Sequence, residues 1–282
     1  MNQIFLPKTL DELWSVLNDY PDAALMAGGT DLLVQRRAGL KPVKNLICLE
    51  RLSELQGISL EKNIMSIGAC VTHRACLDSD MIQHHAPVLT RALTHLGGPQ
   101  IRNMGTLGGN ICTASPAGDS LPALHVLGAK ILLLSRNTQR TLSMEQFITG
   151  PGRTAMKPGE ILAQVHIPSD QGFQIHHFEK IGQRKALAIA MVSLAAMIKT
   201  GQRGIIKEAR LAMGSVGPTV IRPKEAEDAL VGRTLSISAL RHAAGLISKA
   251  VNPISDIRAT AEYRREAAGN LMLRLSLIPA KK

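Results

Sequence analysis

The sequence predicts an α+β fold made of two compact units. At 282 residues, the chain is longer than one average domain. Short apolar runs typical of strands alternate with helical patterns up to about residue 172, whereas three strand-like runs followed only by helical patterns occupy the rest of the chain. We therefore expect a first domain at residues 1–172 and a second, smaller α+β domain at residues 173–282.

The first strands and helices can be predicted in chain order. Apolar residues recur at helical spacing after Thr9, which predicts a short amphipathic helix: Leu10, Leu13, Trp14 and Leu17. Strands are expected at 23–27, 46–49, 58–60, 64–67, 129–134 and 160–167, and helices after residue 31, after Thr72, at 87–96 and up to about residue 127. The strands at 58–60 and 64–67 are close enough to form a hairpin.

The second domain has a simpler predicted order. Strand-like runs at 175–181, 188–199 and 205–212 are joined by turns that contain glycine. Helical patterns follow at 224–230, 237–249 and 259–276. This order of strands and then helices favours one sheet packed against a helical layer.

A first glycine-rich loop follows the predicted strand at 23–27. Its residues Gly28, Gly29, Thr30 and Asp31 stand directly before an apolar helical run. Glycines in such a turn leave backbone N–H groups free to bind a diphosphate, and the start of a helix favours an anion. The spacing is not that of a Rossmann or P-loop motif, so we exclude both.

A second loop, residues 106–124, has almost no bulky side chain before Leu121. Gly108 and Gly109 allow close approach of a ligand to the backbone, and short polar side chains offer hydrogen bonds. Pro116 suits the first turn of a helix, and Asp119 suits either its N-cap or an acceptor for a ligand hydroxyl. A surface loop would also explain this stretch, but two such loops about eighty residues apart favour one large nucleotide-type ligand.

Catalytic side chains are not evident. The neighbouring histidines at 84–85 and 176–177 lack zinc-site spacing, and the serines at 115 and 120 lack a nucleophile elbow. Lys180, Arg184 and Lys185 fit either a solvated turn or contact with a flavin edge or a phosphate. If the protein is an enzyme, we expect a cofactor to carry the chemistry while the chain positions it.

Composition limits the compartment and the partners. The four cysteines show no metal or disulfide spacing, the N-terminal residues have no signal-peptide layout, and no apolar run is as long as a membrane span. We therefore expect a cytoplasmic protein with reduced thiols. The net charge of +11 raises nucleic-acid binding as an alternative, but the basic residues are spread out and only seven residues are aromatic. An anionic cofactor or an acidic partner subunit explains the charge equally well.

Several motifs in the same order resemble those of the FAD-binding medium subunit of molybdenum hydroxylases, the family of the xanthine dehydrogenase and carbon monoxide dehydrogenase flavoproteins. The matching segments are AGGTDLL at 27–33, TLGGNI at 106–111, TASP at 113–116 with Asp119, GEIL at 159–162, FEKIGQRKA at 178–186 and ATAEYRR at 259–265. The resemblance runs along essentially the whole chain.

The resemblance implies a PCMH-type FAD-binding domain of two subdomains, about 1–55 and 56–172, followed by a CO-dehydrogenase-flavoprotein C-terminal domain at 173–282. It also implies non-covalently bound FAD. The implied cofactor-binding residues are Met26, Ala27, Gly28, Gly29, Thr30, Asp31, Leu32, Thr106, Gly108, Gly109, Asn110, Ile111, Thr113, Ser115, Asp119, Arg153, Leu162 and Lys180. The diphosphate would lie against the two glycine loops, and Arg153, Leu162 and Lys180 would lie near the isoalloxazine.

The function implied is electron transfer within a hetero-oligomer. Electrons would pass from molybdopterin on a large subunit, through two [2Fe–2S] clusters on a small subunit, to FAD on this chain and on to an acceptor such as NAD. The alternative is a flavin-binding accessory or regulatory module without turnover of its own. A neighbouring gene for a molybdopterin subunit would favour the first interpretation.

Overall fold

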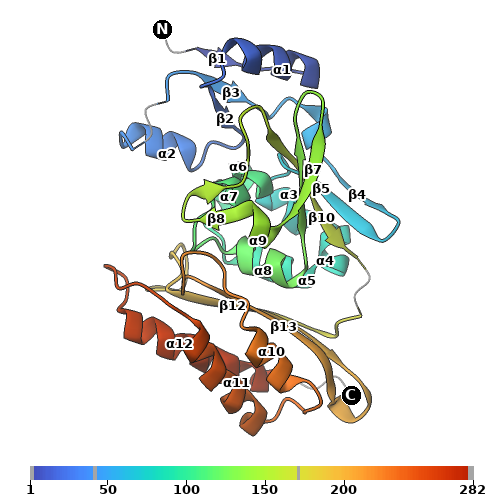
Figure 1. Cartoon of the computed structure of the whole chain (residues 1–282), viewed down its shortest axis with the longest axis vertical. Coiled ribbons are helices and arrows are strands. Elements are labelled where there is room, and N and C mark those ends of the chain that lie inside the picture. The colour runs from blue at the N-terminus through green and yellow to red at the C-terminus, as the bar shows by residue number, and fades with distance from the viewer. Residues whose placement is uncertain (1–2, 41–42, 170–171, 279–282) are drawn as a thin grey trace. The chain divides into compact units, whose positions relative to one another are not determined.

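The computed structural model describes residues 3–40, 43–169 and 172–278, and the chain divides into two compact units (Figure 1). Unit 1 comprises residues 1–85, 97–114 and 129–169, and unit 2 comprises residues 86–96, 115–128 and 170–282. The chain thus enters unit 2 twice before its C-terminal third. Of the helices described, none is long and apolar enough to cross a membrane.

Two main sheets form the framework of unit 1. A parallel three-stranded sheet has the order β1-β3-β2, from β1 (Ile4–Phe5), β3 (Leu46–Cys48) and β2 (Ala24–Met26). An antiparallel five-stranded sheet has the order β4-β5-β10-β6-β7, from β4 (Ile58–Glu61), β5 (Ile64–Gly68), β10 (Ile161–Pro168), β6 (Lys130–Leu134) and β7 (Gln139–Ser143). The small pair β8 (Ile148–Gly150) and β9 (Arg153–Thr154) completes the unit's strands. The hairpin predicted from the sequence is the β4–β5 pair.

Short helices connect the strands of unit 1. They are α1 (Leu10–Asp19), α2 (Leu32–Arg37), α3 (His73–Asp78), α4 (Asp80–His85), α6 (Pro99–Met104), α7 (Leu107–Thr113), α9 (Met144–Phe147) and a 3₁₀ turn (Ser53–Leu55). Helix α1 begins as predicted, because the Thr9 side chain accepts a hydrogen bond from the Glu12 N–H. Its buried residues Leu13 and Trp14 pack with Ile47 and Ile161 in the core.

Unit 2 is built on an antiparallel sheet with β12 (Val192–Thr200) between β11 (Ile175–Ile181) and β13 (Ile206–Gly214). Helices α10 (Lys224–Leu230), α11 (Ile237–Ala250) and α12 (Ala261–Leu273) cover one face, followed by a 3₁₀ turn (Arg274–Leu277) (Figure 1). Helices α5 (Pro87–Thr94) and α8 (Ser120–Val126) pack against the other face. The α+β prediction is confirmed, with every predicted strand and helix of the second domain present.

The position of β12 in the sheet explains why its residues 194–198 are all apolar rather than alternating with polar ones. Successive side chains point to opposite faces of a sheet. Leu194 and Ala196 belong to the core with the helical layer, whereas Ala195 and Met197, equally buried, alternate with them and face the side where α5 and α8 lie. A strand covered on both faces has no solvent-facing row to fill with polar residues.

Two boundaries in unit 2 differ from prediction. The strand expected at 188–199 begins only at Val192, because residues 182–190 form a loop in which Leu187 adopts a positive φ of 54°. The helix expected at 259–276 ends at Leu273 and continues as the 3₁₀ turn. The periodicity of apolar residues does not distinguish these last turns from an α-helix.

Candidate functional site

The first glycine loop joins β2 to α2, as the sequence predicts. Gly28 packs directly against the main-chain carbonyl of Met104, so a side chain at this position would overlap with backbone. Gly29 has a φ of 68°, in the left-handed region that favours glycine. Each glycine of the pair is therefore required for a different reason.

The backbone of this loop offers unused hydrogen-bond donors. Among the described residues, none accepts a hydrogen bond from the N–H groups of residues 28–31, whereas the carbonyls of Gly29 and Asp31 accept from Leu33 and Gln35. Successive free N–H groups in a glycine turn form a concave site suited to a phosphate oxygen. This arrangement matches the sequence expectation for the first loop.

The second glycine motif does not form the open loop that we expected. Residues 107–113 are helix α7, and the Thr106 side chain caps it by accepting from the Gly109 N–H at 3.0 Å. The N–H groups of Leu107 and Gly108 donate to the carbonyls of Val71 and Ala69. The prediction that this motif presents free N–H groups to an anion is therefore wrong at these three positions.

Gly108 is needed for packing within the protein. A Cβ atom at Gly108 would overlap with Ala69, so the glycine allows α7 to lie directly against the turn after β5. Ile111 is fully buried, and Asn110 is partly buried. Sequence reasoning interpreted the Gly-Gly pair as a loop because glycine disfavours helices, but the Thr106 cap and the close packing outweigh that preference.

The structure brings the two motifs of unit 1 together although they lie far apart in the sequence. The Thr113 hydroxyl donates to the Asp31 carboxylate at 3.0 Å. Gly28 lies against the end of α6, and the Thr30 hydroxyl would be 3.2 Å from a Cβ atom placed on Gly105. Sequence reasoning missed the contribution of α6, although a proline directly after two glycines is a typical helix start.

Two hollows border the first loop. The larger, of about 380 Å³, is lined by the predicted site residues Ala27, Leu32, Gly108, Gly109 and Leu162, with mainly apolar neighbours that include Cys112. The smaller, of about 170 Å³, is lined by Ala27 and Gly28 of the loop, with Met104 and Thr106. Their size suits parts of an extended ligand rather than a large compact one.

Arg153 and Leu162, the other predicted site residues of unit 1, differ in exposure. Leu162 is buried in β10 and pairs with Leu133 of β6. Arg153 is exposed in β9, and its guanidinium folds back against Gly150. The structure therefore places Leu162 at the larger hollow and Arg153 on the surface of the unit.

Ser115, Asp119 and Lys180 belong to unit 2. The Ser115 hydroxyl accepts from the Ala117 N–H at 3.3 Å in a tight turn. Helix α8 begins at Ser120, so Pro116 does not lie in its first turn, and the Asp119 side chain makes no capping hydrogen bond. The prediction for Pro116 is therefore wrong. Asp119 does occupy the N-cap position, but its carboxylate does not cap the helix because it has another partner.

That partner is Lys180, whose ammonium group lies 2.6 Å from Asp119 Oδ2. Both side chains are more than nine-tenths buried, and Lys180 also donates to the His95 carbonyl. Asp119 Oδ1 is buried without a hydrogen-bond donor. Burial raises the pKa of Asp119 to about 6 despite the opposing effect of the Lys180 charge. An unsatisfied buried carboxylate oxygen is an acceptor available to a hydroxyl group of a ligand.

A buried histidine lies behind the junction of the two motifs. The N–H of His73 donates to the Gly105 carbonyl, and the imidazole, 2% exposed, packs close to Gly105. Burial, reinforced by the charge of Arg102, lowers the pKa of His73 to about 4. The imidazole is therefore neutral at physiological pH, and it supports the backbone beside Thr30.

The cysteines carry no reactive chemistry. All four are free, and burial raises the pKa of Cys70 and Cys76 to about 12, which keeps both thiols protonated. Within the described residues, no group of three or more histidine, cysteine or acidic side chains could hold a metal ion.

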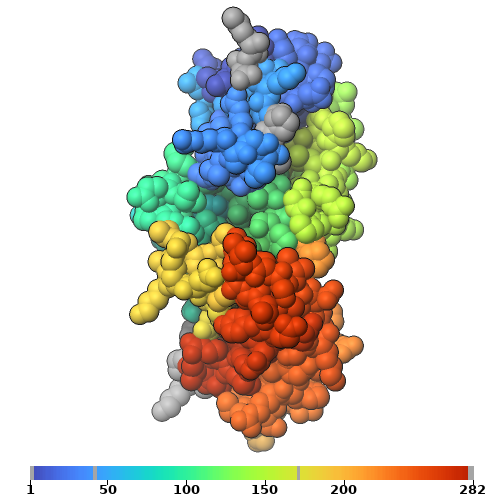
Figure 2. Space-filling model, turned by 90° about the vertical axis from the view of Figure 1, so that its left-hand side faces the viewer, coloured from blue at the N-terminus to red at the C-terminus, as the bar shows by residue number. Residues whose placement is uncertain are grey.

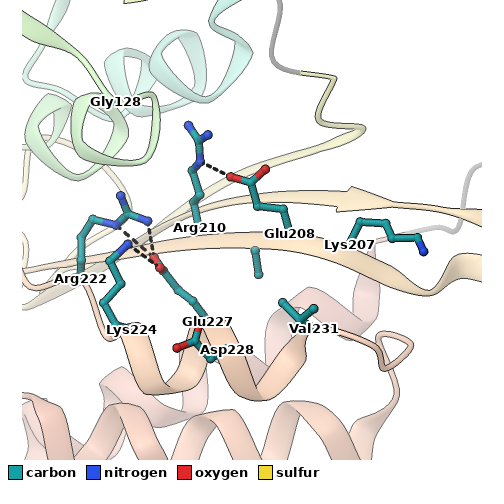
Figure 3. Close-up of a pocket in the computed structure, with 10 residues that line it drawn as sticks. Gly128, Lys207, Glu208, Arg210, Arg222, Lys224, Glu227, Asp228 and Val231 are labelled. Atoms are coloured by element: carbon teal, nitrogen blue, oxygen red, sulfur yellow. Dashed lines mark hydrogen bonds and ion pairs between the residues drawn. The ribbon is translucent and has the colours of Figure 1, made fainter.

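A third hollow, of about 480 Å³, lies in unit 2 beside β13 and α10 and is lined mostly by charged residues. Figure 3 shows Arg222 and Lys224 turned toward the buried carboxylate of Glu227, which also accepts from the Leu211 N–H. Arg210 pairs with Glu208. Because Arg210, Arg222 and Lys224 are all paired with carboxylates, we interpret this cluster as one that fixes α10 to β13.

Comparisons with known proteins cover nearly the whole chain. Residues 1–170 match the model of the FAD binding domain in molybdopterin dehydrogenase, and residues 177–277 match that of the CO dehydrogenase flavoprotein C-terminal domain. The chain is 31% identical to the nicotinate dehydrogenase FAD-subunit of Eubacterium barkeri, with 97% of this chain and 94% of that protein covered. It is 34% identical to the putative xanthine dehydrogenase FAD-binding subunit of Escherichia coli, with 91% and 88% covered.

Solved structures agree with these matches. A chain of quinoline 2-oxidoreductase from Pseudomonas putida 86 superposes with a TM-score of 0.93 at 31% identity, covering 98% of this chain and 96% of that chain. A chain of a Cu,Mo-CO dehydrogenase gives a TM-score of 0.91 at 30% identity, covering 96% and 95%.

Proposed function

Because this chain belongs to the FAD-binding medium subunits of molybdenum hydroxylases, the xanthine and CO dehydrogenase family, we propose that it binds FAD non-covalently and carries electrons through it. In this proposal the electrons come from [2Fe–2S] clusters on a small subunit, which receives them from a molybdopterin-binding large subunit. They leave to an acceptor such as NAD. The complex is a cytoplasmic hetero-oligomer.

The observation that carries the proposal is the row of free N–H groups at residues 28–31. A buried or half-buried backbone donor without an acceptor is rare in folded proteins, and here several stand in succession in a glycine turn. The larger, mainly apolar hollow and the smaller one, whose lining includes Thr72, Asn103 and Thr106, fit parts of a dinucleotide that flank its diphosphate.

The chain's own residues then have separable tasks. The N–H groups of residues 28–31 hold the diphosphate, and the Thr113–Asp31 hydrogen bond fixes the loop that carries them. The unsatisfied Oδ1 of Asp119 accepts from a hydroxyl group of the cofactor, while Lys180 keeps the carboxylate in place. Leu162 and Arg153 contribute an apolar surface and a cationic group. Bound FAD supplies the redox chemistry, because it exchanges electrons with both one- and two-electron partners.

We retain the sequence boundary near residue 172 as part of this proposal, with residues 1–172 as the FAD-binding domain and subdomains at about 1–55 and 56–172. The site residues named in the sequence analysis are proposed as the cofactor-binding set, with one change of role. Thr106, Gly108 and Gly109 build α7 and its packing, so they support the first loop rather than offering N–H groups of their own.

An absorption spectrum of the purified chain tests the proposal. Flavin bands that move into the supernatant after acid precipitation are expected, and added FAD should restore them to stripped protein. Asp119→Asn should weaken FAD binding about tenfold, roughly 1.4 kcal/mol, because the amide removes the charged acceptor but still accepts from Lys180.

The matched control is Asp228→Asn, a change of an exposed carboxylate in α10 of the same unit. It should leave flavin affinity unchanged. A chain that is folded by circular dichroism but neither contains nor takes up FAD would refute the proposal.

A further inference from the structure

Unit 2 contains a buried arginine, Arg264 of α12, whose charge is only partly compensated. The residue is 4% exposed, whereas the side chain of its acidic partner, Asp256, is 26% exposed. The Nε atom of Arg264 is buried and has no acceptor among the described residues. Burial of a charge and of an unsatisfied donor both cost free energy, and an apolar side chain of similar volume would avoid that cost. The cost indicates that Arg264 has a task besides stabilising the fold.

The second terminal nitrogen of Arg264 is bound to the main chain. Nη1 donates to the Met191 carbonyl at 2.7 Å and to the Ser215 carbonyl at 3.0 Å. Met191 directly precedes β12, and Ser215 directly follows β13. Because Ser193 of β12 pairs with Gly214 of β13, these two carbonyls lie at the same end of the sheet. One guanidinium nitrogen thus joins the start of one strand to the end of its neighbour.

On one side, this connection continues to the lysine of the candidate site. The Met191 N–H donates to the carbonyl of Ile181, the last residue of β11, at 2.8 Å. The preceding residue is Lys180, whose ammonium group lies 2.6 Å from Asp119 Oδ2. The backbone next to Lys180 is therefore tied to the Arg264 guanidinium through a single intervening residue.

On the other side, the connection continues to the aspartate. The Ser215 N–H donates to the Pro116 carbonyl at 2.9 Å. Pro116 lies in the tight turn in which the Ser115 carbonyl accepts from the Gly118 N–H at 2.9 Å. Asp119 is the next residue after this turn. Both members of the buried ion pair are thus held by segments that converge on Arg264.

Ser215 is held in an unfavourable backbone conformation. Its φ is 63°, in the left-handed region that disfavours a residue with a side chain. Its hydroxyl donates to the Ala190 carbonyl at 2.8 Å, and its own carbonyl accepts from Arg264. Such a conformation persists only where the surroundings impose it, and it is found mainly at ligand sites. The strain therefore agrees with a role for this residue in holding the turn before Asp119.

Arg264 is itself fixed from the side of α12. Besides its bond to Arg264 Nη2, the Asp256 carboxylate accepts from the N–H groups of Arg258 at 2.8 Å and Ala259 at 3.2 Å. The carboxylate is thus held by the chain that carries it, and it orients the guanidinium in turn. Figure 2 shows the orange-red segment that leads into α12 bordering the yellow segment between β11 and β12.

We propose that Arg264 is a positioning residue for the flavin site in unit 2. It holds the turn before Asp119 and the end of β11 at the separation that lets Asp119 and Lys180 pair, with Asp119 Oδ1 left as the acceptor for a hydroxyl group of the cofactor. Its effect reaches the two side chains through the Met191 and Ser215 carbonyls. This inference rests on the proposed function.

The first test is a double-mutant cycle on FAD affinity, measured with the full chain after its folding has been checked by circular dichroism. Arg264→Met removes the donors at similar length and should weaken FAD binding about tenfold. Because Arg264 acts through Asp119, adding Arg264→Met to Asp119→Asn should weaken binding by less than about a further twofold. A residue that only stabilised the fold would instead give independent losses that multiply to about a hundredfold.

Two further variants separate positioning from stability. An ammonium group in the place of Nη1 can donate to both carbonyls, so Arg264→Lys should recover most of the FAD affinity. Arg222→Met is the matched control, because it removes another mostly buried guanidinium of unit 2 that is paired with Glu227. It should lower the Tm and leave FAD affinity unchanged.

Hydrogen–deuterium exchange tests the connection without flavin. In the apo chain, Arg264→Met should speed exchange in residues 114–121 and 189–193 by at least about tenfold, because the two carbonyls lose their donor. The β4–β5 hairpin of unit 1 should be unaffected, and Arg222→Met should not change exchange in residues 114–121. The parent chain provides a measurement that does not depend on any variant folding. By reciprocity, FAD binding should slow exchange in residues 189–193 and 213–217.

Four results would overturn the inference. They are multiplying losses of affinity in the double variant, unchanged exchange of residues 114–121 in Arg264→Met, equal losses of affinity in Arg222→Met and Arg264→Met, and FAD binding that leaves residues 189–193 and 213–217 unprotected. Failure of the proposed function is distinguishable. A folded parent chain that takes up no FAD would refute that function, whereas exchange in the apo chains still decides whether Arg264 holds the two segments.

Discussion

At the residue scale, the first loop depends on two glycines that act differently. Gly29 is needed for its φ of 68°, and Gly28 is needed because the Met104 carbonyl occupies the space of a side chain. Conformational strain alone is tolerated by a loop, but an overlap with backbone displaces the loop itself. The two glycines thus differ in what a substitution would do to the free N–H groups.

Gly28→Ala should therefore impair flavin binding by displacing the loop from α6. We expect FAD affinity to fall by about tenfold or more, roughly 1.4 kcal/mol, measured by fluorescence titration of stripped protein. Gly39→Ala is the control, because Gly39 has a similar φ of 72° but open space around it. It should cost about 1–2 kcal/mol in stability without changing FAD affinity. Equal losses of affinity in both variants would show that strain, not the contact with α6, controls the loop.

His73 predicts acid sensitivity of unit 1. Its pKa is about 4 when folded and 6.5 in the unfolded chain, so only the unfolded state gains a proton as the pH falls from 6.5 toward 4. Its contribution to stability is present above pH 6.5 and is lost across that window, by about 3 kcal/mol in total. The fluorescence of Trp14, the only tryptophan, reports urea unfolding of unit 1.

His73→Gln, which stays uncharged, should flatten the dependence of the free energy of unfolding on pH between 4 and 6.5. His242→Gln, a change of an exposed histidine in α11 of unit 2, is the control and should leave the slope unchanged. If His73→Gln retained the slope of the parent chain, the buried imidazole would not be its origin.

At the scale of elements, α7 shows what a sequence can and cannot reveal. Apolar periodicity was sufficient for β11, β12, β13 and α11, because long elements bury one or both faces in a regular order. It was insufficient for α7, where Gly108 and Gly109 resemble a loop. Gly108 lies in contact with Ala69, and Gly109 lies close to Thr106. Only the fold reveals the positions of these two neighbours.

The same limit applies to the candidate site. The strand–glycine–helix order identified the first loop, because its chemistry lies in consecutive residues. The Asp119–Lys180 pair was not foreseen, because its members lie 61 residues apart and nothing local distinguishes a capping aspartate from a paired one. Sequence reasoning thus singled out Asp119 and Lys180 as candidate site residues, but it did not predict that they pair with each other.

Thr106→Ala tests the role of α7 as a support for the first loop. Loss of this N-cap should cost about 1 kcal/mol of stability and should weaken FAD binding, because α7 carries Thr113, which holds Asp31. Thr72→Ala removes the equivalent cap of α3 and should cost similar stability with a smaller effect on FAD affinity. Thermal unfolding and FAD titration of both variants provide the comparison, and equal effects on affinity would contradict the supporting role.

Helix α10 depends on one buried carboxylate. Glu227 is 4% exposed and accepts from the Leu211 N–H, Arg222 and Lys224. Glu227→Ala should therefore cost about 3–5 kcal/mol, because it leaves the Arg222 guanidinium and a buried N–H without their partner. Glu225→Ala, at an exposed position of the same helix, should change stability by less than about 0.5 kcal/mol. Urea unfolding followed by far-ultraviolet circular dichroism measures both, and a small effect of Glu227→Ala would show that the cluster is dispensable.

At the scale of the whole molecule, the order of the chain does not follow the two units. Unit 2 takes α5 and α8 from the part of the sequence that precedes residue 129. Every residue of α8 is buried, and Gly214 of β13 leaves no space for a side chain beside Pro122 of α8. The sheet of unit 2 therefore gains the cover of its second face from segments far away in the sequence.

This interleaving predicts that residues 173–282 do not form a stable domain alone. Without α5 and α8, the face of β12 that carries Ala195 and Met197 would be exposed, and an apolar surface of this kind promotes association and loose packing. The isolated fragment should bind the dye ANS strongly, unfold without cooperativity and give a poorly dispersed NMR spectrum, whereas the full chain should not. A well-dispersed spectrum and cooperative unfolding of the fragment would show that the three helices α10, α11 and α12 suffice to hold the sheet. The helical cover supplied by the N-terminal part of the sequence would then serve the site rather than the fold.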